Sequence, residues 1–583
     1  MRERIIIKIM NYKLIKPVNI NLDVITQILC NRGIAENEIS HYLNTTENDI
    51  YDTRLLDNID IGVKMLLDCI ENKKKIHIIP DVDVDGFTSA AILINYIYCM
   101  DNDYAKEFIT FEINDEKIHG IRLETIPSDI SLLVCPDSSS NDYEQHKILK
   151  EKGIQVLVLD HHDADKISEN ACIINNQLCD YPNKSLSGAG IVYKFCCRID
   201  EVKNTHYTER FLDLVAVGLV GDMVSLRDFE TKHFVQQGIR KINNPFLKCI
   251  LDKNKFFVGT ELTPKGIAFS VAPQINATIR MGSKSEKRTL FESMLDFMAY
   301  IQVPSTKRGC KGQTETRVEQ ACRNCTNIKN RQTRARDASL ELVESQIKDK
   351  NLLQNKIITV TVGNDFNKNL SGLIANELVA KYQHPVLILR DVGNEWSGSA
   401  RGCNGSDLED FKGFVSSTGL PSLAQGHPNA FGFAIEKDKL DSFINKSNEE
   451  LKSCNFNPCY KVDFIYNNFD FKSSDIIKIA ELDSIYGQDM EKPYIAIENI
   501  SVTKENLILM SPDKKPTLKI KLQNGCDLIK FKSSEEEYES LISKTGCVKI
   551  NVVGRCNQNI WMGRTTAQIT VEDYEIMGET YYF

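Results

Sequence analysis

The 583-residue sequence contains no apolar run that approaches the ~18 residues needed to span a bilayer. Its first residues, MRERIIIKIMNYK, include only a short apolar run and no small-residue cleavage site, which is not typical of a signal peptide. The sequence also lacks internal repeats and low-complexity segments. With 42% hydrophobic and 26% charged residues, it is neither collagen-like, coiled-coil nor disordered. We expect a cytoplasmic protein of about three or four domains, at ~150 residues each.

Cysteine spacings typical of metal binding or disulfides are scarce. The 18 cysteines are scattered, and in the cytosol we expect them to be reduced, semi-buried thiols. The tightest set is Cys310, Cys322 and Cys325, which has one CxxC, no second CxxC and no nearby histidine, so a zinc site is not favoured. The net charge of −9 argues against nucleic acid coating the whole surface, but it allows a local basic groove.

Short β-rich apolar runs alternate with helical stretches between about residues 50 and 240. The runs at 76–80, 131–136 and 156–160 each end in a polar cluster and are followed by helix-like sequence. This alternation predicts a mostly parallel sheet with helices on its faces. In such a sheet ligands bind at the carboxyl ends of the strands, so we expect the three polar clusters to converge there.

The second half of the sequence predicts a long helix, a smaller α/β block and a β domain. Residues 314–362 lack Gly and Pro, and Thr316 to Glu319 fits a capping box, so we expect a helix to about Lys350. Between Val303 and Arg336 lie nine Lys and Arg against two Glu, which indicates either a solvated connecting helix or one wall of a phosphate-binding groove. After about residue 455, successive short strands predict a small barrel or sandwich.

The sharpest motif is the acidic run DVDVDG at residues 81–86. On an extended segment, Asp81, Asp83 and Asp85 place their carboxylates on one side, and Gly86 lets the chain turn into a helix. Hard divalent cations prefer such oxygen ligands. An EF-hand is excluded, because its loop needs an acid where this chain has Ile92 and a helix where this chain has a strand.

Acids and imidazoles also follow the next apolar stretches. Asp137 follows the second strand, Asp160, His161 and His162 follow the third, and Asp222 closes a later apolar stretch. Each alone is more often a helix cap or a structural residue, but clusters at three consecutive strand ends are hard to ascribe to chance. Mixed Asp/His ligation suits Mn²⁺ or Mg²⁺. Two such metals, about 3.5–4 Å apart, could activate water and clamp a phosphoryl oxygen.

The order and spacing of these motifs resemble the DHH phosphoesterase superfamily. The matching segments are DVDVDG, PDSSS, LVLDHHD, SGAG and VGDMVSL. Further along, GSARG (398–402) and QGHPNAFG (425–432) resemble the companion DHHA1 domain. APQINATIR (272–280) and LDSIYGQDMEKPYI (482–495) are similar to segments of the RecJ branch.

The resemblance implies roles for these residues. Asp83, Asp85, Asp137, His161 and Asp222 match metal ligands, with Asp137 bridging, while the ligand role of Asp81 stays open. The catalytic set is Asp160, His161 and His162, in which Asp160 supports the histidines and His162 contacts the scissile phosphate or positions the water. The chain departs from the family in three places: Ile79 replaces a frequent His, Ser138–Ser140 replaces a glycine, and Gln425 replaces the first Gly of a later motif.

Candidate substrate-binding residues are distributed over several segments. At Ser187, Gly188 and Gly190, a helix N-terminus could approach a phosphate, although close helix packing explains the same residues. The C-terminal domain resembles an OB fold, and its aromatics Tyr494, Phe531, Tyr538 and Trp561 are equally typical of a core or of base-stacking platforms. The resemblance adds Asn276, Arg280, Arg331, Arg334, Ser399, Arg401, Gly426 and His427.

The residues themselves predict metal-dependent hydrolysis of phosphoesters on a polyanion. The resemblance implies a RecJ-like exonuclease specific for single-stranded DNA, which uses Mn²⁺ or Mg²⁺ to release 5′-mononucleotides from a 5′ end in repair or recombination. The alternatives are a small-substrate DHH phosphodiesterase, acting on an oligoribonucleotide, nucleotide bisphosphate or cyclic dinucleotide, and a non-catalytic replication scaffold. Expected partners are single-stranded DNA and a single-strand-binding protein or helicase, with no membrane.

The fold class is α/β: a parallel-sheet DHH domain and a smaller α/β DHHA1 domain joined by a long helix, plus an OB-like β-barrel. The expected divisions are an N-terminal segment (1–50), the DHH domain (51–245), the connecting region (246–350), the DHHA1 domain (351–455) and the OB-like domain (456–583).

Overall fold

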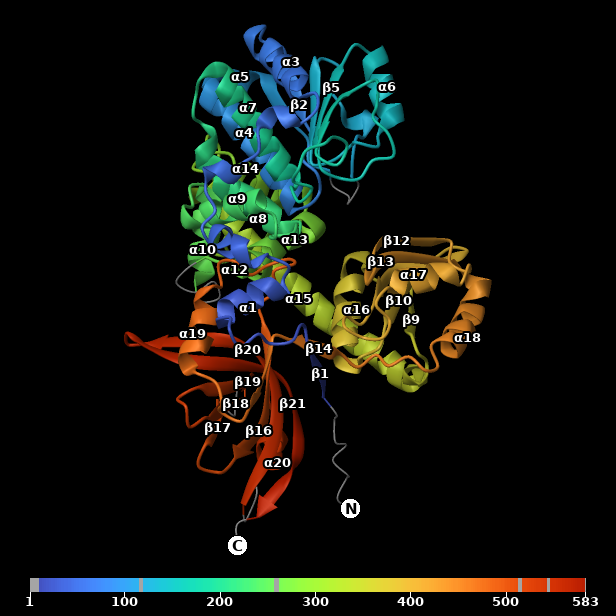
Figure 1. The fold of residues 1–583 in the computed structure, drawn as a ribbon. Coiled ribbons are helices and arrows are strands. Elements are labelled where there is room, and N and C mark those ends of the chain that lie inside the picture. Colours follow the sequence, from blue (N-terminus) through green and yellow to red (C-terminus); the bar gives the residue numbers. More distant parts are fainter. Residues whose placement is uncertain (1–9, 115–118, 256–261, 512–515, 543–545, 582–583) are drawn as a thin grey trace. The chain divides into compact units, whose positions relative to one another are not determined.

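The computed structural model describes residues 10–114, 119–255, 262–511, 516–542 and 546–581 (Figure 1). The chain forms two compact units. The N-terminal unit comprises residues 34–330 and 482–491, and the C-terminal unit comprises residues 1–33, 331–481 and 492–583. Among the described residues, no helix combines the length and the apolar character that crossing a membrane requires.

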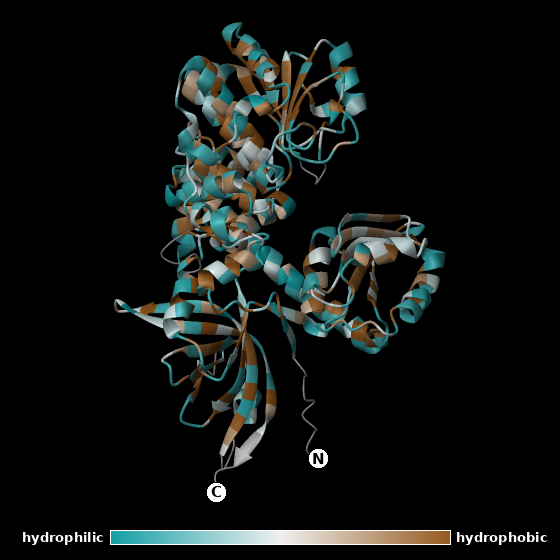
Figure 2. Ribbon diagram, in the orientation of Figure 1, coloured by the Kyte–Doolittle hydropathy of each residue, from teal (hydrophilic) through white to brown (hydrophobic). Residues whose placement is uncertain are grey.

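The N-terminal unit is built on a five-stranded sheet whose neighbouring strands are all parallel. The buried strands of this sheet are strongly apolar (Figure 2), as expected where helices cover both faces. The predicted parallel sheet is therefore confirmed. Its order is β3 (Ile109–Phe111), β2 (Ile76–Ile78), β4 (Leu132–Pro136), β5 (Gln155–Asp160) and β6 (Cys172–Asn175).

Helices pack against this sheet and extend beyond it. Helix α4 (Val84–Met100) begins inside the acidic motif, because the Asp83 carboxylate caps it by accepting the Gly86 N–H at 3.1 Å. Helix α8 (Leu212–Gly221) packs on α4 and ends where Asp222 follows. The other helices of this unit include α3 (Ile59–Glu71), α5 (Asn102–Phe108), α6 (Tyr143–Glu151), α7 (Gly188–Lys203), α9 (Phe229–Arg240), α10 (Pro245–Lys253), α13 (Ala272–Met281) and α14 (Lys284–Ser293).

The predicted long helix is present as α15 (Arg317–Asp349). Its capping box forms as expected, since the Thr316 N–H donates to Glu319 Oε2 at 3.0 Å and the Glu319 N–H donates to Thr316 Oγ1 at 3.4 Å. The helix runs across the boundary between the two units at residue 331. Its cations are partly neutralised, because Arg317 pairs with Glu292 at 3.0 Å and Arg336 with Glu377 at 3.3 Å.

The C-terminal unit contains a second five-stranded sheet, which is mixed. Only β9 and β10 pair in parallel, and the other neighbours are antiparallel. Apolar side chains from its strands and helices, among them Leu387, Phe411 and Phe433, form its core. The order is β12 (Leu423–His427), β13 (Ala430–Glu436), β11 (Glu395–Arg401), β10 (Val386–Val392) and β9 (Ile358–Val362), with helices α16 (Lys368–Tyr382), α17 (Phe411–Ser417) and α18 (Leu440–Glu450).

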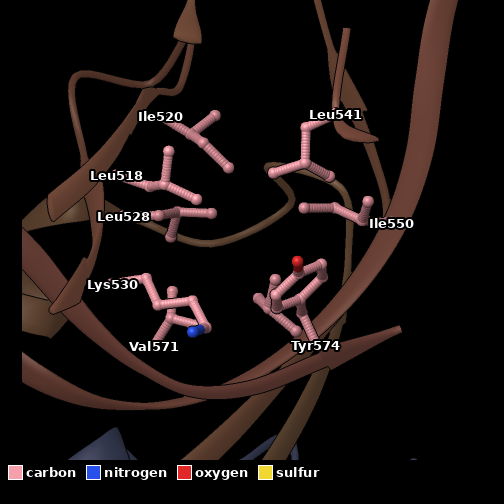
Figure 3. Close-up of a pocket in the computed structure, with 9 residues that line it drawn as sticks. Leu518, Ile520, Leu528, Lys530, Leu541, Ile550, Val571 and Tyr574 are labelled. Atoms are coloured by element: carbon pink, nitrogen blue, oxygen red, sulfur yellow. The ribbon is translucent and has the colours of Figure 1, made fainter. Parts of the chain in front are cut away.

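The C-terminal unit also contains a seven-stranded sheet, which is barrel-like without closing. Its inward side chains, including Leu518, Ile550 and Tyr574, converge on a cavity of about 10 Å³ (Figure 3), no more than one water molecule needs, so this interior is core and not a ligand pocket. The order is β15 (Phe464–Asn467), β16 (Tyr494–Val502), β20 (Gly546–Trp561), β21 (Arg564–Tyr581), β19 (Asp527–Phe531), β18 (Thr517–Lys521) and β17 (Leu507–Met510).

The expectation that this domain has only short strands is wrong for β20 and β21. They form one hairpin of 16 and 18 residues. The expected strands cover only its buried part, because the outer part (residues 557–566) is largely exposed and its apolar residues, Ile560, Trp561 and Met562, are consecutive and do not alternate with polar ones. Cross-strand hydrogen bonding continues this hairpin where the hydrophobic pattern stops.

Candidate metal centre

The carboxyl edge of the parallel sheet gathers the predicted acids and imidazoles. They come from four places: the loops after β2, β4 and β5, and the end of α8. Three sets of ligand atoms each lie within 4.8 Å of one another, close enough to surround a cation. The sets are Asp85, His161 and Asp222; Asp81, Asp83 and Asp137; and Asp137, His161 and His162.

His161 and Asp137 meet at the centre of this arrangement. His161 Nε2 lies 3.2 Å from Asp137 Oδ1, 3.6 Å from Asp222 Oδ2 and 3.9 Å from Asp85 Oδ2. Both Nε2 of His161 and Oδ1 of Asp137 are buried and make no hydrogen bond. Buried polar atoms without partners are costly, and a shared cation would satisfy both. The donor set therefore fits Mn²⁺ or Mg²⁺.

The N-terminus of α7 holds Asp85 in place. Ser187 Oγ donates to Asp85 Oδ1 at 2.8 Å, the Gly188 N–H donates to Oδ2 at 2.6 Å, and the Ala189 N–H donates to Oδ1 at 3.1 Å. Two of the N–H groups that the sequence suggested for a phosphate thus already bind a carboxylate of the chain itself. Gly190 packs near Leu186. The phosphate-binding role of this segment stays a prediction.

Three glycines allow the acids to come this close. A Cβ at Gly86 would lie 2.5 Å from the Cβ of Asp81, and one at Gly188 would lie 2.4 Å from the Cβ of Asp137. A Cβ at Gly218, in α8, would lie 2.4 Å from Asp85 Oδ1. Such distances exclude any side chain, so these positions need glycine for close approach. Gly218 was not singled out from the sequence, because it sits in an ordinary apolar helix.

Burial and mutual repulsion raise the pKa values of two of the acids. The pKa of Asp137 is raised well above its ordinary value, mainly by burial and then by Asp85 and Asp83. For the same reasons the pKa of Asp222 is raised to about 8. Burial also lowers the pKa of His161. A divalent cation would reverse the tendency of the two acids, since it favours the ionised carboxylate, and would reinforce that of His161, since it favours the neutral imidazole.

Asp160 and His162 form a separate ion pair at the rim. Burial by itself would raise the pKa of Asp160, but the hydrogen bond from His162 and the nearby imidazoles lower it to about 2. His162 Nδ1 lies 2.7 Å from Asp160 Oδ1, and this bond raises the pKa of His162 to about 9. The ring of His162 is half-exposed. It therefore offers a positive charge beside the acidic groups at neutral pH.

The loop after β4 adopts an uncommon backbone. Asp137 has φ of 67° and Ser139 has φ of 82°, both in the left-handed region that favours glycine. This is the segment where Ser138–Ser140 replaces a family glycine. The Ser140 N–H donates to Asp160 Oδ2 at 3.1 Å, which ties the strained loop to the neighbouring strand end.

The remaining predicted residues of α13 and α15 are not part of this cluster of ligand atoms. Asn276 is half-buried, and its Oδ1 is buried without a hydrogen-bond partner. Arg280, Arg331 and Arg334 are exposed. Cys322 and Cys325 are buried and Cys310 is half-buried, and none of them belongs to a possible metal-binding group among the described residues.

A second cluster lies on the mixed sheet of the C-terminal unit. Ser371 Oγ and Ser399 Oγ are 2.8 Å apart, and Arg401 lies so close to α16 that a Cβ at Gly372 would meet its guanidinium at 2.6 Å. Arg401 and His427 both face Ala430 across neighbouring strands, which places them on one face of the sheet. Gly426 and His427 are exposed.

One residue near the metal centre was missed from the sequence. His119, between β3 and β4, places Nδ1 2.6 Å from Asp81 Oδ2. No spacing pattern links it to the acids, because it follows none of the strand ends that carry them.

Comparison with known proteins agrees with this architecture. Residues 75–219 match the model of the DHH family, N-terminal domain, and residues 468–573 match that of the RecJ OB domain. The chain is 35% identical to a putative SPbeta prophage-derived single-strand DNA-specific exonuclease, YorK, of Bacillus subtilis, over 97% of this chain and 98% of the relative. It is 24% identical to the single-stranded-DNA-specific exonuclease RecJ of B. subtilis, over 94% of this chain and 67% of the relative.

A solved structure has a similar fold. RecJ of Thermus thermophilus in complex with Mn²⁺ superposes with a TM-score of 0.70 at 16% identity, covering 97% of this chain and 79% of that one. The fold and the matched domains define a DHH-type protein with a RecJ OB domain. The chain belongs to the RecJ family of single-strand DNA-specific exonucleases.

Proposed function

We propose that this chain is a metal-dependent exonuclease that degrades single-stranded DNA from the 5′ end and releases 5′-mononucleotides. The observation that carries the proposal is the meeting of Asp137 and His161 among four other buried or half-buried acids, with two buried atoms left for a cation. Two relatives are named single-strand DNA-specific exonucleases, which supports single-stranded DNA as the substrate. A role in DNA repair or recombination, in the cytoplasm, with a single-strand-binding protein or helicase as partner, belongs to the same proposal.

Two cation positions would share Asp137. Asp85, His161 and Asp222 would hold one cation, and Asp83, with Asp137, would hold the other. When bound, the cations lower the pKa of water and stabilise charge on a phosphate oxygen. The protein contributes ligands fixed before the substrate arrives, because the α7 N-terminus already orients Asp85.

Residues other than the proposed cation ligands would bind and orient the DNA. His162, held by the ionised Asp160, presents a positive charge that can donate a hydrogen bond to the scissile phosphate. Arg280, Arg331 and Arg334 are exposed cations that can contact backbone phosphates. On the mixed sheet, Ser399, Arg401, Gly426 and His427 would contact the strand end, with Arg401 as the phosphate ligand.

Cleavage of single-stranded DNA labelled at the 5′ or the 3′ end tests this proposal. We expect Mn²⁺-dependent release of labelled mononucleotide from a 5′-labelled single strand at early times, and slow release from the 3′-labelled strand. A blunt duplex and a dinucleotide should be poor substrates. Preference for the dinucleotide would instead indicate a small-substrate phosphodiesterase. A wild-type chain as inert as Asp137→Asn, but able to bind the strand, would indicate a scaffold.

A further inference from the structure

A second Asp–His pair lies at the candidate metal centre, in addition to the Asp160–His162 pair. His119 Nδ1 is 2.6 Å from Asp81 Oδ2, and the two side chains are 51% and 2% exposed. The histidine follows β3 in the chain, whereas Asp81 follows β2, and these strands are parallel neighbours. The pair is therefore a tertiary contact between the segments that follow two adjacent strands.

Of the possible ligand sets found in the described part of the chain, Asp81 belongs to the one that consists of carboxylates alone. Its partners in that set are Asp83 and Asp137, whereas the other two sets each contain His161. Three carboxylate oxygens within 4.8 Å repel one another, and burial leaves little water to screen them. An N–H donor on the outer oxygen of Asp81 lowers this repulsion and fixes the orientation of the carboxylate.

Two residues before Asp81, the chain has an isoleucine and no imidazole. Ile79 is 3% exposed and packs in an apolar cluster with Ile121, two residues after His119. The imidazole that comes close to Asp81 belongs instead to the segment between β3 and β4.

We propose that His119 is a positioning residue for the second cation: its Nδ1–H donates to Asp81 Oδ2, so that the other oxygen of Asp81 ligates a divalent cation together with Asp83 and Asp137. The proposal rests on the metal centre of the proposed function, but not on its substrate. A cation keeps Asp81 ionised, and an ionised carboxylate only accepts hydrogen bonds, so Nδ1 must carry the proton.

Mn²⁺ binding to the full chain, measured by titration calorimetry without DNA, tests the assignment. We expect two Mn²⁺ per wild-type chain. His119→Ala should weaken one of the two sites by about 10- to 100-fold and leave the other within twofold, because loss of a partner that orients a ligand has this effect on metal affinity.

Two conservative variants identify the nitrogen that acts. Asn places an N–H near the position of His Nδ1, whereas Gln places one near Nε2. His119→Asn should therefore restore most of the lost affinity and His119→Gln should not. If His119→Ala does not fold, the Mn²⁺ affinities of the Asn and Gln variants still test whether Nδ1 is the donor. At low Mn²⁺ the turnover of His119→Ala should fall, and it should recover when Mn²⁺ is raised.

The chain offers a matched control. His41 Nε2 lies 2.6 Å from Asp49 Oδ1, and these side chains are 55% and 6% exposed, but the pair belongs to no possible metal-binding set among the described residues. His41→Ala should leave both Mn²⁺ sites unchanged. Two unaltered sites in His119→Ala, a single site in the wild type, or rescue by Gln but not by Asn would overturn the proposal. Because no substrate is present, failure of the exonuclease assignment would be seen separately, in the labelled-strand assay.

Discussion

The two five-stranded sheets of this protein carry polar residues in opposite ways. The parallel sheet of the N-terminal unit buries Asp81, Asp85 and Asp137 at one edge, where their charges repel. The mixed sheet of the C-terminal unit leaves Arg401 half-buried and His427 exposed. A buried carboxylate is stable only together with its neighbours and a cation, whereas a solvent-accessible side chain can bind a ligand from solution independently of the others. We therefore expect that loss of one ligand abolishes the activity of the first site, whereas loss of one residue at the second site only weakens binding.

The largest effect should come from the acid shared by two of the candidate sets. Asp137→Asn removes one charge from both cation positions, so kcat should fall on the order of 10³-fold or more, while the strand still binds. Single-turnover cleavage of a 5′-labelled strand and filter binding measure the two quantities. Asp129→Asn, at an exposed acid of the same unit, serves as the control. Substantial cleavage by Asp137→Asn would show that the first site tolerates the loss of one acid, which would contradict the proposed difference between the two sheets.

Removal of metal should destabilise only the N-terminal unit. A cation that binds the folded state alone stabilises it by about 2.7 kcal/mol at 100 times its Kd. Differential scanning calorimetry with EDTA and with saturating Mn²⁺ should show one transition that shifts and one that does not. A shift of equal size in both transitions would show that the cation does not stabilise the N-terminal unit selectively.

The pH dependence of the metal-free protein should follow the buried acids. The folded pKa of Asp222 is raised to about 8, above the ordinary value of an Asp. Its stabilising contribution is therefore complete at low pH and is lost as the pH rises from about 4 through about 8. Denaturant unfolding in EDTA should show stability falling over this range, and Asp222→Asn should flatten the slope. Saturating Mn²⁺ should oppose the fall, because metal binding displaces the protons.

Loss of the arginine on the mixed sheet should be milder. Arg401→Ala removes one charge-assisted contact to a phosphate, so KM for a 5′-phosphorylated strand should rise about 10- to 100-fold with little change in kcat. Arg390→Ala, on β10 of the same sheet, is the matched control. A fall in kcat without a change in KM would place Arg401 in the chemical step instead.

The smallest effect should come from the tip of the β20–β21 hairpin. Trp561 is 69% exposed there, and residues 555–571 contain two arginines and no acid. Stacking on one base is worth about 1–3 kcal/mol, so Trp561→Ala should weaken binding of a long single strand about tenfold and that of a very short strand not at all. The chain has two tryptophans, so Trp396→Phe leaves Trp561 as the only one. Its fluorescence should be quenched by the strand, and an unchanged signal would exclude stacking.

Much of the fold could be predicted because local patterns carry it. The apolar runs at 76–80, 131–136 and 156–160 correspond to β2, β4 and β5, and the capping box correctly marked the start of α15. The meeting of Asp137 with His161 was also predictable, since strand ends of a parallel sheet share one edge. The full length of β20 and β21 was not, because cross-strand pairing rather than hydrophobic alternation extends them.

The sequence by itself determined which chemistry is present: hard oxygen and imidazole ligands at successive strand ends, and a helix long enough to cross from one unit into the other. Only the tertiary structure decided which partner each group has. The N–H groups of Gly188 and Ala189 bind Asp85, Gly218 leaves room for that carboxylate, and His119 reaches Asp81 from the segment between β3 and β4. The reason is physical: these contacts join residues distant in the chain, and packing distances of a few ångström leave no trace in local periodicity.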